Sequence, residues 1–263
     1  AVVSPGLGRP AAALSSDIVI SQVYGGGGNA GATYTHDFVE LFNRGTVAVD
    51  VTGWSVQYAS ATGGGFFGAT TTQITPLTGT IQPGQYFLVL EASGGANGVA
   101  PPATDVTDAS PIAIGGSAGK VALVTDSTSL GCNGSAGQPC NASQLARIKD
   151  LVGFGATAAS PPNFFEGAGP APEPNPSATN GVQRLGGGCT ETDNNNTDFV
   201  EATPAPRNTS STLNVCGGGD TAPSVTGTTP TDNATNVAVD AAVTITFSEA
   251  VNVSGTIQVV GTV

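Results

Sequence analysis

The sequence is short of charge, and above all of positive charge. Lys and Arg number 7 against 19 Asp and Glu, which gives a formal net charge of −12, and charged residues are only 10% of the total, compared with about 25% in an ordinary soluble protein. The basic residues are scattered, and only Arg147 and Lys149 lie close together. Because phosphate binding depends on clustered Lys and Arg, the composition argues against a direct grip on nucleic acid. An acidic surface instead suits divalent cations, cationic partners or solubility in salty water.

Methionine is absent even at residue 1, and histidine and tryptophan occur once each. The missing Met indicates that the original start of the chain has been removed. Residues 1–16 lack the long apolar core of a signal peptide and contain Pro5 and Pro10, so we expect them to be the flexible beginning of a mature secreted protein. No run approaches the ~18 apolar residues of a membrane helix, and no membrane span is therefore expected.

The four cysteines allow three disulfide pairings. Cys132 and Cys140 bracket a flexible loop that can close on itself, which leaves Cys189 to pair with Cys216. No Cys-x-x-Cys motif occurs and there is one histidine, so a zinc site is not expected. Disulfides indicate an oxidising compartment, and the sequence therefore predicts a secreted, extracellular or cell-surface protein.

Strand signals recur along the chain between Gly, Pro and Asn turns, while helical periodicity is almost absent. In 38–43, Val39 and Leu41 share one face, and the segment 86–90 is apolar on both faces, which favours a central strand. One short helical turn is expected within 143–149. This pattern predicts an all-β fold, an antiparallel β-sandwich. The further predicted strands are 18–24, 54–58, 120–125, 148–154 and 182–185.

The largest apolar side chain is expected to anchor the core of this sandwich. Trp54 opens a segment of clean alternation, so we expect it inside, with Val56, with Val39 or Leu41, and with Leu88 or Leu90. The long segments 94–110 and 160–179 are expected to be surface loops.

A change in composition at 217–222 predicts a linker and divides the chain. Residues 1–16 form the tail, 17–216 one β-sandwich, and 223–263 the first strands of a second, Ig-like β domain. The last segment lies near the ~40-residue limit below which an isolated core is seldom stable. Either further residues or a strand of another chain is expected to complete it.

Two glycine-rich segments imitate enzyme signatures. Residues 26–31 fit G-x-G-x-x-G after a strand but lead into another strand, whereas nucleotide binding needs a helix there. Residues 115–119 fit G-x-S-x-G but precede a strand, whereas a nucleophile elbow follows one and opens a helix. The sole imidazole, His36, borders a strand and is expected at the surface. We therefore read both segments as loops and assign no catalytic residue.

The strongest candidate for a site is an Asp- and Asn-rich loop. Asp193, Asn195 and Thr197 place side-chain oxygens at alternate positions, and Asp198 lies beside them. Oxygen ligands of this kind suit a hard cation such as Ca²⁺, so these four residues form the calcium hypothesis.

The spacing departs from an EF-hand, because Asp198 stands where glycine is required and Pro204 where the bidentate Glu belongs. The favoured alternative is an Asx-turn loop held by the Cys189–Cys216 disulfide. Glu166 and Glu173, in a Pro-rich segment, would add ligands if the fold brought them near.

An ordered set of motifs over about 17–216 resembles a lamin-tail domain, an Ig-like β-sandwich appended to many secreted bacterial enzymes. The set consists of Ile-Val-Ile-Ser-Gln-Val-Tyr at 18–24, Asp-Phe-Val-Glu-Leu-Phe-Asn at 37–43, Gly-Trp-Ser-Val-Gln-Tyr at 53–58, Ile-Gln-Pro-Gly-Gln-Tyr-Phe-Leu-Val at 81–89, Asp-Leu-Val-Gly-Phe-Gly at 150–155, Val-Gln-Arg-Leu at 182–185 and the stretch 193–208. The segment from 223 resembles the opening strands of a bacterial Ig-like domain.

In bacteria such domains resemble accessory modules of secreted nucleases and phosphatases, whose catalytic Asp, Glu, His and Asn constellation is not found in this sequence. The resemblance predicts a non-catalytic accessory or binding module at the N-terminus of a larger secreted enzyme, an extracellular nuclease. Its partners would be domains downstream of Val263, the extracellular matrix or a cell surface. The alternative is a structural subunit of an extracellular fibre or surface layer, joined by β-strand addition.

Overall fold

The computed structural model describes residues 15–63, 65–217, 224–231 and 233–248. The chain divides between Cys216 and Gly217 into two compact units, and each is described by itself. Most of the predicted tail at 1–16 and of the predicted linker at 217–222 lies outside the described residues.

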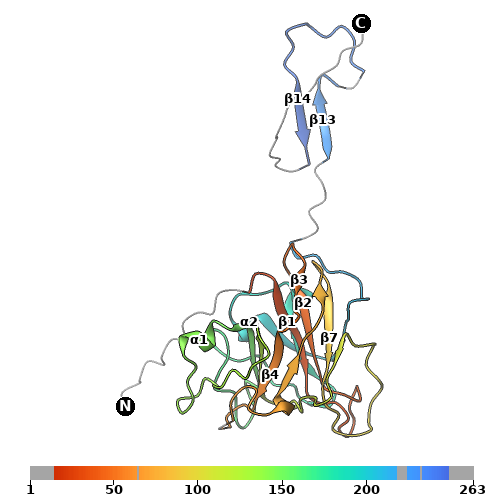
Figure 1. The fold of residues 1–263 in the computed structure, drawn as a ribbon. Coiled ribbons are helices and arrows are strands. Elements are labelled where there is room, and N and C mark those ends of the chain that lie inside the picture. The colour runs from red at the N-terminus through yellow and green to blue at the C-terminus, as the bar shows by residue number, and fades with distance from the viewer. Residues whose placement is uncertain (1–14, 64, 218–223, 232, 249–263) are drawn as a thin grey trace. The chain divides into compact units, whose positions relative to one another are not determined.

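The first unit is a sandwich of two sheets (Figure 1), so the predicted all-β class is confirmed. The larger sheet has the order β12-β11-β1-β2-β7-β8 and the smaller the order β10-β9-β4-β5. All pairs are antiparallel except β7 with β8. The larger sheet contains β1 Ile18–Tyr24, β2 Phe38–Asn43, β7 Tyr86–Leu90, β8 Val106–Thr107, β11 Gly181–Arg184 and β12 Phe199–Ala202, and the smaller contains β4 Ser55–Ala59, β5 Ile74–Pro76, β9 Gly119–Val124 and β10 Ile148–Phe154.

The remaining elements of this unit are short. They are the strand pair β3 Val49–Asp50 with β6 Thr80–Ile81, the 3-10 turns η1 Thr71–Gln73 and η2 Leu185–Gly188, and the helical turns α1 Ala142–Leu145 and α2 Asn195–Asp198. A capping box of Asn141 and Gln144 explains α1: the Asn141 side chain accepts from the Gln144 amide, and the Gln144 side chain accepts from the Asn141 amide.

The main core lies between the sheets, where strand alternation points apolar side chains inward. Val39 and Leu41 of β2 face Val56 of β4 there, as the period of two predicts. Trp54 corrects the prediction. It precedes β4, is only partly buried and packs at the edge of this cluster. Leu88 does not reach it either, because β7 points Phe87 and Val89 inward and turns Leu88 to the opposite face.

The outer face of the larger sheet is also buried, because the C-terminal strap (residues 203–216) crosses it. Gln22 donates to the Ala205 carbonyl over 2.8 Å. Arg207 forms an ion pair of 2.7 Å with Glu40 and lies 3.7 Å from the ring centre of Tyr86. The strap and Tyr34, which packs against Tyr24 and Phe38, together cover the outer face of β1 and β2, whose residues are all buried.

Both predicted disulfides are present. Cys132 is bonded to Cys140, and Cys189 to Cys216. The second bond ties the end of the strap to the residue that follows η2, and both of its cysteines pack against a small apolar cluster of Val19, Phe42 and Tyr86.

The two segments expected to be surface loops are partly built into the fold. The segment 94–110 contributes β8 to the larger sheet. The segment 160–179 buries Phe164 in an apolar cluster with Phe67 and Leu151 and buries Glu166 as well. Because these segments are long and lack periodicity, the sequence predicts loops. Buried side chains nevertheless hold both segments to the sandwich.

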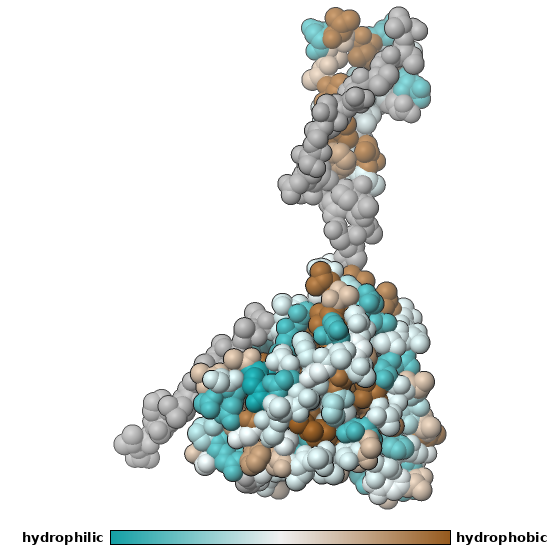
Figure 2. All heavy atoms as spheres, viewed as in Figure 1, coloured by the Kyte–Doolittle hydropathy of each residue, from teal (hydrophilic) through white to brown (hydrophobic). Residues whose placement is uncertain are grey.

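The second unit is described as a hairpin of β13 Val225–Thr229 and β14 Thr244–Phe247. A two-stranded hairpin alone is marginally stable in water. Val225, Val239 and Val243 are more than half exposed, at 57%, 108% and 52%, and Figure 2 shows apolar side chains on the surface of this unit. On the face of the first unit shown there, apolar side chains are scattered among polar and neutral ones.

Candidate functional site

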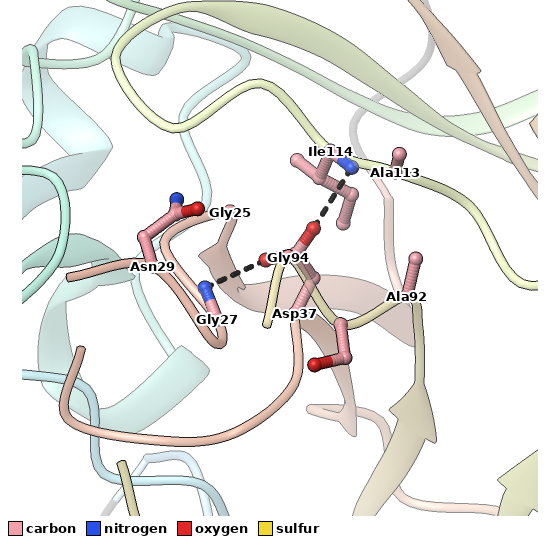
Figure 3. Close-up of a pocket in the computed structure, with 9 residues that line it drawn as sticks. Gly25, Gly27, Asn29, Asp37, Ala92, Gly94, Ala113 and Ile114 are labelled. Carbon is pink, nitrogen blue, oxygen red and sulfur yellow. Dashed lines mark hydrogen bonds between the residues drawn. The ribbon is translucent and has the colours of Figure 1, made fainter. Parts of the chain in front are cut away.

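One cavity opens where β1 ends, β2 begins and β7 ends, since antiparallel pairing brings these three ends to the same edge of the sheet. Its volume is about 200 Å³, below the ~300 Å³ at which ligand pockets usually begin. It therefore suits a few waters or one small chemical group. Its walls are Gly25, Gly27, Asn29, Asp37, Ala92, Ser93, Gly94, Ala113 and Ile114 (Figure 3).

The glycine-rich turn fits this place because larger residues would not. A Cβ on Gly27 would lie 2.0 Å from the His36 carbonyl carbon, and Gly28 has a φ of +73° while its amide donates to the Tyr34 carbonyl over 2.9 Å. The chain then enters β2 with no helix between. The G-x-G-x-x-G segment is thus a packed loop, and the G-x-S-x-G segment likewise runs directly into β9 at Gly119.

Asp37 is the one ionisable group in the cavity wall, and it is 5% exposed. Its carboxylate accepts from the amides of Gly27, over 2.8 Å, and Ile114, over 3.0 Å (Figure 3). These two hydrogen bonds hold the loop that contains Gly27 and the segment that contains Ile114 to the start of β2. Burial raises the pKa of Asp37 to about 7, against the two amide bonds, which lower it.

The second candidate is a buried polar cluster around Arg184 on β11. The guanidinium lies 2.8 Å from a carboxylate oxygen of Asp150, also pairs with Glu191, and lies 3.6 Å from Asp198. Its other face is 4.5 Å from the ring centre of Phe199. The positive charge of Arg184 is thus close to three acidic side chains from different parts of the sequence.

Within this cluster, carboxylate oxygens of Asp150, Glu166 and Glu191 lie within 4.8 Å of one another. Burial raises the pKa of Glu166 and raises that of Glu191 to about 7. The three acids could supply oxygen ligands to a metal. However, Arg184 already lies against Asp150 and Glu191, and Glu166 accepts from the Asn195 amide group over 3.1 Å.

Three of the four residues of the calcium hypothesis, Asn195, Thr197 and Asp198, already make side-chain hydrogen bonds within the protein. Asn195 points inward, where its oxygen accepts from the amides of Gly153, over 2.9 Å, and Glu166, over 3.2 Å. Its nitrogen donates to the Leu151 carbonyl over 2.9 Å. Asn195 therefore clamps β10 to the 160–179 segment.

The carboxylate of Asp198 accepts from the Thr192 amide over 2.8 Å, and the Thr197 hydroxyl donates to the Asn194 carbonyl over 3.2 Å. Asp193 has a φ of +58°, and its amide donates to Glu191 over 2.7 Å. A calcium shell from this loop remains a prediction, and it would have to replace these hydrogen bonds.

The sequence suggests Glu166 and Glu173 as additional metal ligands, and the fold brings one of them near the 193–198 loop. Glu166 joins the Arg184 cluster, whereas Glu173 accepts from the Thr157 hydroxyl over 2.8 Å. Sequence reasoning missed Asp150 because it reads as one polar residue in an apolar strand. That position was itself the signal: a charge on a buried strand requires a buried partner.

Comparison with known families identifies the N-terminal part of the first unit. Residues 11–136 match the family model of the Lamin Tail Domain. The chain carries a lamin tail domain. Residues 219–262 match the family model of the Bacterial Ig-like domain, in part. The resemblance expected from the motif order is thereby confirmed.

No curated protein matches the chain. Among solved structures, a DUF4876 family protein from Bacteroides thetaiotaomicron is similar at 12% identity, over 75% of this chain and 74% of that chain, with a TM-score of 0.42. A lamin tail domain followed by a bacterial Ig-like domain indicates a binding or accessory module. None of the described helices is both long and apolar enough to cross a membrane.

The basic side chains of the lamin tail domain are occupied internally. Arg9 lies outside the described residues. The other Lys and Arg side chains are bonded as follows: Arg44 to the carbonyls of Ser15 and Cys189, Lys120 to Asn133 and Asn163, Arg147 to Asp126, Lys149 to Asp17, Arg184 to the acidic cluster and Arg207 to Glu40.

Proposed function

We propose that this chain is a non-catalytic binding module of a larger secreted bacterial enzyme, an extracellular nuclease, which it attaches to a cell surface or an extracellular matrix. One observation carries the proposal: a lamin tail domain and part of a bacterial Ig-like domain follow one another in the same chain. Domains with these Ig-like folds usually bind or space, and the chemistry would belong to another domain.

The side chains support this division of labour. The ring of His36 bonds to the hydroxyl of its neighbour Thr35 over 2.9 Å. The Ser117 of the G-x-S-x-G segment sits before a strand and not at a strand-to-helix turn. A direct grip on nucleic acid is not expected of this module, because its described Lys and Arg side chains are engaged internally and the chain has a formal net charge of −12. Two disulfides support export to an oxidising compartment.

The coding sequence beyond Val263 tests the parent enzyme. A metal-dependent nuclease domain in the same reading frame is the expected result. A different catalytic domain would retain the accessory role and refute the nuclease, and a stop codon soon after Val263 would refute both.

A structural subunit of a fibre or surface layer is the second candidate, favoured by the exposed valines of the β13–β14 hairpin. A strand from a neighbouring chain would cover them. Sedimentation of the purified chain distinguishes the two roles: ordered polymers at micromolar concentration support the fibre, and a monomer supports the accessory module.

A further inference from the structure

Asp37 and Glu91 lie opposite one another at the ends of neighbouring strands. The β2–β7 register pairs Phe38 with Leu90, and the next residues are joined by the bond from the Glu91 amide to the Asp37 carbonyl, 2.9 Å long. Both side chains point between the sheets. Glu91 accepts from the Thr75 hydroxyl of β5, in the opposite sheet, over 3.0 Å.

The two carboxyls hold one segment in place. Glu91 accepts from the Ile112 amide over 2.8 Å, and Asp37 accepts from the Ile114 amide over 3.0 Å. The Ala92 amide in turn donates to the Ile112 carbonyl over 2.9 Å. Ala113 and Ile114 of this segment form part of the cavity wall.

No positive charge balances this pair. Among the described residues, neither acid forms an ion pair with Lys, Arg or His, and one oxygen of the 1%-exposed Glu91 has no hydrogen-bond partner. Asp108 adds a further negative charge near Glu91. The other titratable groups around Asp37 are the phenols of Tyr24 and Tyr58 and the adjacent His36 ring, which is bonded to Thr35.

We propose that Asp37 and Glu91 form a proton-binding pair, and that loss of their protons releases residues 112–114 from the end of the sandwich as the pH rises above neutral. The cavity gives Asp37 a route for exchange with solvent (Figure 3). Ionised, Glu91 would carry a charge on a 1%-exposed carboxylate that has no cation partner among the described residues. The two amide bonds favour the ionised acids and lower both pKa values, but the cost of burying two charges with no cation beside them is larger, so opening of residues 112–114 relieves that cost.

Burial raises the pKa of Asp37 to about 7 and that of Glu91 to about 8, whereas both are near 4 in an unfolded chain. Between these values the folded state binds more protons than the unfolded state. The stabilisation is therefore complete below about pH 4 and is lost as the pH rises through about 7 to 8, at about tenfold in the folding equilibrium per pH unit and per group.

The test is thermal unfolding of the full chain from pH 5 to 9, together with amide hydrogen exchange of Ile112 and Ile114. In the wild type the Tm should fall with pH, and the protection of both amides, corrected for intrinsic rates, should fall at least tenfold between pH 6 and 8. Glu91→Gln, which imitates the protonated acid, should flatten both curves. Glu173→Gln, at a surface acid bonded to Thr157, is the matched control and should behave as the wild type.

Identical pH dependence in the wild type and Glu91→Gln would overturn the proposal, as would unchanged protection of Ile112 and Ile114. If Glu91→Gln does not fold, carboxyl ¹³C titration of the wild type decides. Midpoints of Asp37 and Glu91 near 7 to 8 support the pair, and midpoints near 4 refute it.

Discussion

Replacing Arg184 by Met should be the most damaging single change in the first unit. The guanidinium is completely buried and holds Asp150 and Glu191, with Asp198 at 3.6 Å. Methionine fills a similar volume but leaves these acids without a cation. Removing one partner of a buried pair costs about 3–5 kcal/mol, and a further loss is expected because the Arg184 Nε also donates to the Ile20 carbonyl of β1 over 2.9 Å.

The pH dependence of this loss identifies its cause. Burial already raises the pKa of Glu191 to about 7 and raises that of Glu166. At pH 5 Glu191 is protonated and fewer unpaired charges remain, so Arg184→Met should cost less at pH 5 than at pH 8. If the loss came only from packing, it would be the same at both values.

Urea unfolding of the wild type and the variant at pH 5 and pH 8 measures the difference. Arg147→Met is the matched control, because Arg147 pairs with Asp126 at the surface, with side chains 27% and 39% exposed. Such pairs contribute about 0–1 kcal/mol. A loss below about 1 kcal/mol for Arg184→Met, or one equal at both pH values, would refute the electrostatic account.

Three further predictions concern the clamp, the core edge and the disulfides. Asn195→Ala should lower stability by about 2–4 kcal/mol, because it leaves the buried amides of Gly153 and Glu166 unpaired. Calorimetry should give the same loss with Ca²⁺ as with EDTA, and a loss that disappears in EDTA would instead support the calcium hypothesis. Trp54→Ala should cost less than the roughly 3–5 kcal/mol of a fully buried aromatic, with wild-type fluorescence between those of buried and free indole; emission of a completely buried indole would contradict its position at the core edge. Removal of the Cys189–Cys216 disulfide, which spans 27 residues, should cost about 3–4 kcal/mol, and removal of the Cys132–Cys140 disulfide, which spans 8, about 2–3 kcal/mol; the reverse order in denaturant titration would contradict the loop-entropy argument.

The fold was predictable where one face of a strand is distinct from the other. Val39 and Leu41 alternate with Glu40, so their inward direction follows from the sequence. The strand 86–90 is apolar on both faces because the strap covers its outer side. The sequence therefore does not show which of its residues face the core between the sheets. It predicts Leu88 or Leu90 beside Trp54, whereas Phe87 and Val89 are the inward residues.

The candidate sites were harder to predict because they join distant segments. The oxygen-rich loop at 193–198 resembles a metal site when all its side chains are assumed to face one centre, but Asn195 turns inward to β10. The sequence does contain an indication of the Arg184 cluster. Arg184 follows Val182 at the spacing that shares a strand face, and a charge on a buried face needs an acid, although the sequence does not say which one.

Hydrolysis by the purified chain of residues 1–263 tests the central claim most directly. The chain should release no product from DNA, RNA or a phosphate monoester in the presence of Mg²⁺, Mn²⁺ or Ca²⁺, because its role as proposed is to bind. Turnover that copurifies with the chain, and that a single substitution such as His36→Ala or Asp37→Asn abolishes while the fold is retained, would contradict the account.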